Sequence, residues 1–323
     1  DQKKLANNEY AGTALVGKAG VEKSYESELH GKTGYQQILV NAQGRHVETL
    51  GRKPYQLERK EPTAGNDLFL TIDEHLQQAA EEMLRDERAA VVAIDPNNGD
   101  VLALVSTPGF DPNLFGRGLS RAQYLSLYEN PEQPMYDRAL KGVYPSGSTI
   151  KPFMAMAALN TGKRAPTTVI QDSGTFQFGN HTFRSHGDHG LGAVDMMRSI
   201  VLSSNVYYYS LANEMGVDLI HEQLRPFGFG IKTGIDLDNE VTGVLPSTEW
   251  KRRYYKRPEQ QKWYAGETIS LGIGQGYNNF TALQLAHATA TLTSGGQRFL
   301  PRLVREIEDP VTGQRQRAAS DAI

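Results

Sequence analysis

Ser148 and Lys151, three residues apart, have side chains that could together perform nucleophilic chemistry. A serine hydroxyl is a weak nucleophile and needs a nearby base to take its proton. Positions i and i+3 of a helix share one face, about 5–6 Å apart, so the lysine could be that base. Gly147 suits a tight turn, and Pro152 is tolerated only in the first turn of a helix. The sequence therefore predicts that Ser148 begins a helix beside Lys151, whose pKa is lowered by burial and by the helix dipole.

The same spacing has an ordinary interpretation, because a serine and a following lysine can be a helix cap and a solvated side chain. The lysine is followed by Pro-Phe-Met-Ala-Met-Ala-Ala-Leu, which predicts a helix over residues 151–159 that is buried on nearly all sides. A lysine on such a helix is unusual unless it has a partner. The motif alone leaves both interpretations open.

A second group, Ser203-Ser204-Asn205, follows 55 residues after Ser148. A second hydroxyl can relay a proton between a lysine and a leaving group, and an amide can hold both the lysine and a substrate carbonyl. Serine and asparagine are also common helix caps, which is the better interpretation of this group taken alone. Combined with the first motif, the group indicates one site built from Ser148, Lys151, Ser203 and Asn205.

The segments around these motifs predict an α+β domain. Residues 90–94 and 101–105 are apolar, β-rich runs around a Pro- and Gly-containing turn, which predicts a hairpin covered on both faces. Helical patterns and capping signals then predict the remaining elements. These are strands at 68–72 and 299–307, a helix capped by Asp73, and helices at 194–202, 207–215 and 281–292. Such an order is typical of helices packed on an antiparallel sheet.

The composition changes near residue 67, which predicts a domain boundary. Before it, glycines recur among charged and polar residues, as in short strands and turns over a thin core, and residues 62–66 resemble a linker. A chain of 323 residues has room for two domains. We therefore expect one domain over 1–66 and a second over 67–323.

Bulk composition excludes several classes of protein. The chain has no cysteine, so it has neither disulfides nor thiolate nucleophiles, and its net charge of −3 does not favour a nucleic-acid surface. No run approaches the 18 or so apolar residues of a membrane span, and no signal peptide opens the chain. The first residues look like the interior of a protein, so we expect the sequence to be a fragment of a longer one.

Taken together, the motifs resemble those of class B penicillin-binding proteins, the monofunctional peptidoglycan DD-transpeptidases, and within them the elongation-type penicillin-binding protein 2 group. The resemblance extends from about residue 17 to about residue 307, with the landmarks in the family's order. They are Gly20-Val21-Glu22, Tyr144-Pro145-Ser146-Gly147-Ser148-Thr149-Ile150-Lys151-Pro152, Ser203-Ser204-Asn205, Thr233-Gly234-Ile235-Asp236-Leu237 and Gly272-Ile273-Gly274-Gln275-Gly276.

The resemblance implies a penicillin-binding/serine β-lactamase-like transpeptidase domain, with an antiparallel sheet flanked by helices, after a partial N-terminal pedestal domain. It implies that Lys151 takes the proton of Ser148 and that Ser148 attacks the carbonyl between the two D-alanines of a stem peptide. Ser203 would relay a proton to the leaving D-alanine, and Asn205 would orient the donor peptide. An amine of a second stem then resolves the acyl-enzyme, and β-lactams block it. No cofactor is expected.

The same resemblance implies partners and a location. The partners would be stem peptides ending in D-Ala-D-Ala, β-lactam antibiotics, a membrane glycan polymerase and elongation scaffold proteins. The protein would lie in the inner membrane with its catalytic domain in the periplasm, the anchor being absent from this fragment. Two rivals remain open: another serine–lysine acylase, such as a carboxypeptidase or β-lactamase, and a non-enzymatic penicillin sensor or scaffold.

Lys232-Thr233-Gly234 has the composition of the third motif of the family, Lys-Thr/Ser-Gly on the sheet's edge strand. We reject it, because it follows the glycine-broken stretch 227–230, which makes a poor central strand, and because the family has a loop at this place. We expect the catalytic version beyond residue 307 and therefore outside this chain. One wall of the site and one donor of its oxyanion hole would then be absent.

Histidines and aspartates cluster before the second motif: His181, His186, Asp188 and His189, with Asp172 just upstream. Some relatives are thought to hold zinc here, using an aspartate, a histidine before a glycine, and a cysteine within the second motif. Asp172 and His189 match the first two, but Ser204 occupies the cysteine position, and a hydroxyl is a far weaker zinc ligand than a thiolate. We therefore expect a polar loop and no metal.

Overall fold

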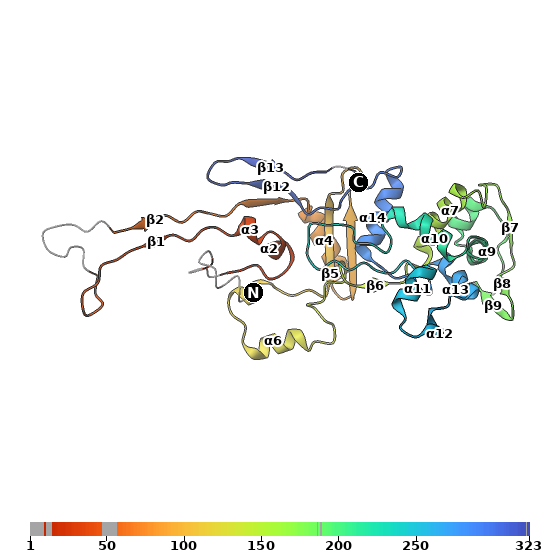
Figure 1. The fold of residues 1–323 in the computed structure, drawn as a ribbon, viewed down its shortest axis with the longest axis horizontal. Coiled ribbons are helices and arrows are strands. Elements are labelled where there is room, and N and C mark those ends of the chain that lie inside the picture. Colours follow the sequence, from red (N-terminus) through yellow and green to blue (C-terminus); the bar gives the residue numbers. More distant parts are fainter. Residues whose placement is uncertain (1–9, 11–14, 47–56, 186, 188, 321) are drawn as a thin grey trace. The chain divides into compact units, whose positions relative to one another are not determined.

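The computed structural model describes residues 10, 15–46, 57–185, 187, 189–320 and 322–323. Contacts divide the chain into two compact units, and the backbone passes between them several times (Figure 1). Of the described residues, the first unit holds those within 1–71, 236–238 and 303–319. The second unit holds those within 72–235, 239–302 and 320–323. The sequence did not predict that two short later segments belong to the first unit, because a long-range contact leaves no local signal.

The described residues of the first unit form two small antiparallel sheets and two short helices. The elements of this unit are α2 (Gly20–Ser24), α3 (Glu26–Leu29), β1 (Tyr35–Gln36), β2 (Arg59–Lys60), β3 (Asp67–Leu70), β12 (Val304–Glu308) and β13 (Arg315–Arg317). One sheet pairs β1 with β2, and the other joins β3 with β12 and β13. The strands expected at 68–72 and 299–307 correspond to β3 and β12, which pair antiparallel with Leu70 opposite Val304. The Asp236 carboxylate accepts hydrogen bonds from the N–H groups of Leu303 and Val304 and from the Tyr25 hydroxyl, which explains why 236–238 belongs here.

The second unit is mixed α and β. It begins with α4 (Glu74–Met83), β4 (Ala89–Ile94), β5 (Val101–Thr107), α5 (Asn113–Gly116), α6 (Arg121–Tyr128), β6 (Val143–Tyr144), the 3₁₀ turn η2 (Gly147–Ile150), α7 (Lys151–Asn160), β7 (Ile170–Asp172), β8 (Thr175–Phe178), β9 (His181–Arg184) and β10 (Gly192–Val194). It continues with α8 (Met196–Val201), α9 (Asn205–Met215), α10 (Val217–Leu224), η3 (Arg225–Phe227), α11 (Thr248–Tyr254), α12 (Pro258–Gln261), α13 (Ala265–Ile269), η4 (Ser270–Ile273), β11 (Phe280–Thr281) and α14 (Ala282–Thr293).

The predicted hairpin is confirmed as β4 and β5, which pair with Val91 opposite Val105. α4 contacts β5, and α14 contacts β4. β5 buries alternate side chains and β4 is half-buried throughout, so the expectation of two fully covered faces holds only in part. Asp73 caps α4 as predicted, because its carboxylate accepts the N–H of Leu76 at 3.0 Å.

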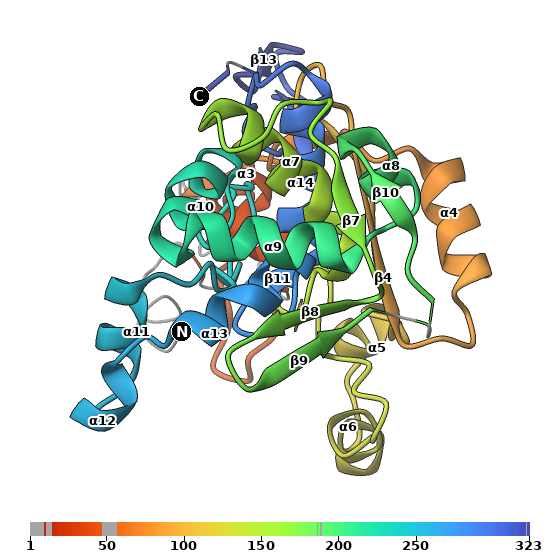
Figure 2. The ribbon, with the colours of Figure 1, turned by 90° about the vertical axis from the view of Figure 1, so that its right-hand side faces the viewer.

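The core of the second unit lies around α7 and α9, which contact one another and α10 (Figure 2). Fully buried side chains such as Met154, Tyr208 and Leu211 form it. α7 covers the helix predicted over 151–159, but Met156 is 45% exposed, so that helix is not buried all round as expected. The core fixes both helices that begin at the two sequence motifs.

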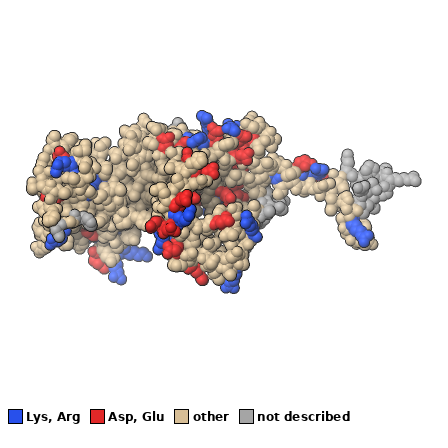
Figure 3. Space-filling model, turned by 180° about the vertical axis from the view of Figure 1, so that it is seen from behind, with Lys and Arg blue, Asp and Glu red and all other residues tan. Residues whose placement is uncertain are grey.

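The distribution of charge on the surface (Figure 3) agrees with the small net charge of the chain. On the face drawn in Figure 3, acidic and basic side chains lie interspersed and form no extended single-sign surface. Within the described ranges, no helix combines the length and the apolar character needed to cross a membrane.

Candidate active site

Ser148 lies in the 3₁₀ turn η2, directly before α7, and its side chain is exposed. The prediction that Ser148 lies at a helix N-terminus is therefore confirmed, although this first turn is 3₁₀; the α-helix starts at Lys151, and Pro152 occupies its first turn as expected. Gly147 has a φ of 56°, and its N–H donates to the carbonyl of Gly274 at 3.0 Å. This contact fixes the turn that presents the serine.

Lys151 is buried at the start of α7, with 1% of its surface exposed. Its ammonium donates three hydrogen bonds, to Ser203 O at 2.7 Å, Ser203 Oγ at 2.9 Å and Asn205 Oδ1 at 2.8 Å. An ammonium has three protons, so all of them are used. The ring of Tyr208 also lies 5.6 Å from Nζ. The lysine of the first motif is thus held by the second motif.

Ser203 connects Lys151 to Ser148. Its hydroxyl accepts from Lys151 and lies 2.9 Å from Ser148 Oγ, to which it donates. Among the hydrogen bonds of the described residues, none joins Lys151 directly to Ser148. The spacing of three residues predicted a direct pair, and the structure shows instead a chain of three groups that passes through Ser203.

Burial lowers the pKa of Lys151 to about 8, and the negative charge of Asp172 partly opposes that shift. A neutral lysine has two protons and one lone pair. Of its three partner atoms, the carbonyl oxygen of Ser203 and the amide oxygen of Asn205 can only accept hydrogen bonds. The Ser203 hydroxyl alone can supply a proton to that lone pair. The geometry therefore offers a route for a proton from Ser148 to Ser203 and on to Lys151.

A cavity of about 500 Å³ opens over these groups. Its lining consists of Gly147, Ser148, Ser185, His189, Leu191, Leu202, Ser203, Asn205, Ile273 and Gln275. The nucleophile candidate and both functional residues of the second motif face this space, while Lys151 lies buried behind them. Its size suits a short peptide or a small molecule.

Lys232-Thr233-Gly234 lies in a loop with no strand, in agreement with its rejection as a site motif. Lys232 is exposed, whereas Thr233 is buried and its N–H donates to Glu240. Gly234 has a φ of 85°. None of the three residues lines the cavity at Ser148.

The candidate metal ligands are not assembled into a site by the part of the chain that the structure describes. His181 lies exposed in β9 with its ring against Phe183, while His189 lines the cavity. Both oxygens of the Asp172 carboxylate accept hydrogen bonds, from Ser204 Oγ and from the N–H of Gly174. His186 and Asp188 lie outside the described residues. With a hydroxyl in place of a thiolate, the described donor set does not fit zinc.

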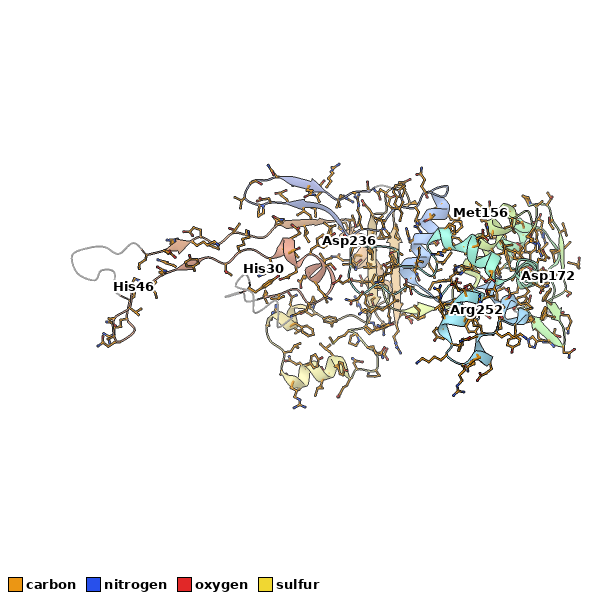
Figure 4. The ribbon with its side chains drawn as sticks, in the orientation of Figure 1. His30, His46, Met156, Asp172, Asp236 and Arg252 are labelled. Carbon is orange, nitrogen blue, oxygen red and sulfur yellow. The ribbon has the colours of Figure 1, made fainter. Side chains whose placement is uncertain are left out.

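Two features of the site were not recognised from sequence. Asp172 was considered only as a metal ligand, yet it is 1% exposed and lies among the packed side chains of the second unit (Figure 4). Gly274 is the second: a Cβ there would lie 2.2 Å from Gly147 O. The signal for Gly274 was available, because Gly272-Ile273-Gly274-Gln275-Gly276 contains three glycines in five residues.

Comparison with known proteins adds two family matches. Residues 89–322 match the model of the penicillin binding protein transpeptidase domain, and residues 1–70 match that of the penicillin-binding protein dimerisation domain. A curated relative, the peptidoglycan D,D-transpeptidase MrdA of Acinetobacter baumannii, is 47% identical over 305 residues. The alignment covers 94% of this chain and 44% of the relative, so the chain spans less than half of that protein's length.

Solved structures give the same result. The crystal structure of Pseudomonas aeruginosa PBP2 in complex with WCK 5153 is similar with a TM-score of 0.84 and 40% identity, covering 99% of this chain and 64% of that one. The complex of PBP2 and MreC from Helicobacter pylori contains a chain with a TM-score of 0.82 and 30% identity, covering 96% of this chain and 57% of that one.

Proposed function

This chain belongs to the penicillin-binding protein transpeptidase family, and from that premise we propose that it is the Ser148-bearing part of a peptidoglycan D,D-transpeptidase. The reaction cross-links stem peptides through an acyl-enzyme during cell-wall elongation, and β-lactams are covalent inhibitors. One observation carries the proposal: Ser148, Ser203 and Lys151 form a continuous hydrogen-bonded chain at the floor of a cavity. Such a chain is what an acylating serine needs.

Acylation begins with Lys151 in its neutral form, which its lowered pKa makes accessible near neutral pH. The proton of Ser148 passes to Ser203, and the proton of Ser203 passes to Lys151. Ser148 Oγ then bonds to the carbonyl carbon between the two D-alanines of a donor stem. The C–N bond breaks, and the terminal D-alanine leaves with the proton returned from Lys151 through Ser203.

Asn205 positions both the base, Lys151, and the donor stem peptide. Its Oδ1 accepts from Lys151, which leaves the Nδ2 group to donate to a carbonyl of the donor stem in the cavity. An amine of a second stem then attacks the ester carbonyl, losing its proton to the same Ser203–Lys151 pair, and Ser148 is released. A β-lactam acylates Ser148 by opening its ring, and because no leaving group departs, the second step is blocked.

The domain assignment follows the same proposal. We assign residues 1–66 to the N-terminal pedestal and 67–323 to the transpeptidase domain, with the segments 236–238 and 303–319 packing in the first unit. The protein that contains them is anchored in the inner membrane with the catalytic domain in the periplasm. Its partners are stem peptides ending in D-Ala-D-Ala, a membrane glycan polymerase and elongation scaffold proteins. The Helicobacter pylori complex of PBP2 with MreC and the structure of a peptidoglycan synthase complex that coordinates polymerization and crosslinking support the protein partners.

Intact-mass measurement after incubation with a penicillin tests the proposal on the full-length gene product, with Ser148→Ala as control. We expect one stable adduct per molecule, mapping to Ser148 and absent from the variant. An adduct that survives the change to alanine would sink the assignment. Rapid penicillin turnover would favour a β-lactamase, and failure to cross-link stems in the presence of the polymerase would favour a sensor.

A further inference from the structure

Asp172 and Ser204 form a buried hydrogen-bonded pair behind the catalytic groups. Each residue is 1% exposed. Ser204 Oγ donates to Asp172 Oδ2 at 2.5 Å, and the N–H of Gly174 donates to Oδ1 at 2.8 Å. A buried carboxylate is costly unless its oxygens are hydrogen-bonded, and here both of them are. The pair joins the end of β7 to the turn between α8 and α9.

Ser204 transmits this anchoring to the second motif. Its hydroxyl has a single proton, which is donated to Asp172, so its lone pairs face the other way. There it accepts the N–H of Tyr207 at 3.1 Å and caps α9. The N–H of Ser204 donates to the carbonyl of Ser199 at 2.9 Å. Ser204 is therefore held by three hydrogen bonds: to Asp172 at the end of β7, to Tyr207 in the first turn of α9, and to the backbone of Ser199.

Ser203, the neighbour of Ser204, needs such support. Its φ of 54° lies in the left-handed region that non-glycine residues rarely adopt, and such a residue persists only where its surroundings hold it. This backbone conformation places Ser203 Oγ 2.9 Å from Ser148 Oγ and presents the Ser203 carbonyl to Lys151. If the hydrogen bonds of Ser204 were lost, the neighbouring backbone of Ser203 could leave this conformation, and the Ser203 hydroxyl would move away from Ser148 and Lys151.

We propose that Asp172 is a positioning residue for acylation, acting through Ser204 to hold Ser203 and Asn205 in register with Lys151 and Ser148. Among the described residues this link is a hydrogen bond and not a shared metal ion, since both Asp172 oxygens already accept hydrogen bonds and Ser204 offers a hydroxyl in place of a thiolate. The inference rests on the proposed function and adds to it two residues that neither touch substrate nor carry the proton.

The test measures acylation by a fluorescent penicillin in the full-length gene product, for wild type, Asp172→Asn and Ser204→Ala. Three quantities are needed: the acylation rate constant, the dissociation constant of the penicillin, and the final adduct per molecule. A displaced catalytic group costs up to about 10²-fold, so we expect the rate constant to fall about 10- to 100-fold. Penicillin affinity and final stoichiometry stay near the wild-type values, because the folded protein remains intact.

Ser247→Ala is the matched control. Ser247 is also a nearly buried cap, 8% exposed, and its hydroxyl accepts the N–H of Trp250 at the start of α11. It should lower the melting temperature as Ser204→Ala does, yet keep the wild-type acylation rate constant. Ser204→Thr, which retains the hydroxyl, should recover the rate relative to Ser204→Ala.

Each remaining outcome decides a separate point. Wild-type rate constants in both Asp172→Asn and Ser204→Ala would overturn the inference. So would a loss of adduct per molecule with an unchanged rate constant, which would mean that the pair serves folding alone. A drop in the wild-type rate on treatment with EDTA would overturn the metal-free arrangement. An adduct on Ser148→Ala would instead refute the proposed function itself.

Discussion

The hydroxyl of Ser203 lies 2.9 Å from that of Ser148, although 55 residues separate the two in the chain. Because Ser203 also accepts from Lys151, it is the only described link between nucleophile and base. We predict that Ser203→Ala lowers the acylation rate constant by about 10²- to 10⁴-fold, the range of a lost proton-transfer group. Stopped-flow or quenched mass measurement with a penicillin gives this value directly.

Ser126→Ala is a suitable control for that change, since the Ser126 hydroxyl is exposed on α6 and bonds only the carbonyl of Gln123 among the described groups. It should leave acylation unchanged. An unimpaired Ser203→Ala enzyme would show that Lys151 deprotonates Ser148 directly, as the sequence spacing first indicated.

The acylation rate should depend on the protonation of Lys151. Burial lowers its pKa from the ordinary value of 10.5 to about 8, and the neutral form is the active one. Below that pKa, the neutral fraction falls about tenfold for each pH unit, so the rate rises with pH and levels off above about 8. A profile measured with a penicillin from about pH 6 to about pH 10 would reveal it. A rate that keeps rising to the pKa of an ordinary lysine would contradict the prediction.

Lys151→Arg separates charge from proton transfer. A guanidinium stays protonated throughout this range and cannot accept the proton, so we predict no measurable acylation. Lys232→Arg is the control, because Lys232 is exposed in a loop outside the cavity lining. Full activity in Lys151→Arg would exclude the lysine as the base, and loss of activity in Lys232→Arg would revive the rejected motif.

Gly274 supports the turn that carries Ser148. It has a φ of 69°, and a Cβ there would lie 2.2 Å from Gly147 O and 2.4 Å from Ser146 Oγ. Gly276 has a similar φ of 72°, but the nearest atom to its added Cβ is 3.6 Å away. Both changes to alanine bring the left-handed cost of about 1–2 kcal/mol. Only Gly274→Ala should also displace the turn and slow acylation, by about 10²-fold.

The acylation rate and the melting temperature of both glycine variants check this. We expect the rate loss only in Gly274→Ala, and a lower melting temperature for Gly274→Ala than for Gly276→Ala, because only the former adds a clash to the left-handed cost. Equal rates in the two variants would show that the Gly147–Gly274 contact does not control the position of Ser148.

Local patterns predicted those parts of the fold that depend on local signals. The β4–β5 hairpin, the Asp73 cap and the helix after Lys151 follow from strand composition, capping chemistry and an apolar run. The same rules leave the type of turn open. Ser148 lies at a helix N-terminus as predicted, but in a 3₁₀ turn, which the i, i+3 spacing cannot distinguish from an α-helical one.

The site was predictable in its residues but not in its connections. The family-like motifs selected Ser148, Lys151, Ser203 and Asn205, and the structure brings all four together. That Ser203 stands between Lys151 and Ser148 depends on its left-handed backbone, and that conformation depends on contacts from β7 far away in sequence. Neither the bridging position of Ser203 nor its left-handed backbone can be predicted from the local sequence.

Arg164 was also missed by sequence reasoning, because a lone arginine in a polar loop has no pattern. Its side chain is 1% exposed and donates to the carbonyl of Tyr207 at 3.0 Å, to Ser210 and to Glu214 on α9. Arg164→Ala removes these hydrogen bonds from a buried charged donor, so we predict a loss of about 2 kcal/mol in the free energy of unfolding; the loss stays moderate because Tyr207 O still accepts from Ser210 and the Glu214 side chain is 42% exposed. Arg253→Ala, which breaks the exposed pair with Glu249, should cost less than about 1 kcal/mol. Urea titration of both variants measures the difference, and equal midpoints would show that α9 does not depend on Arg164.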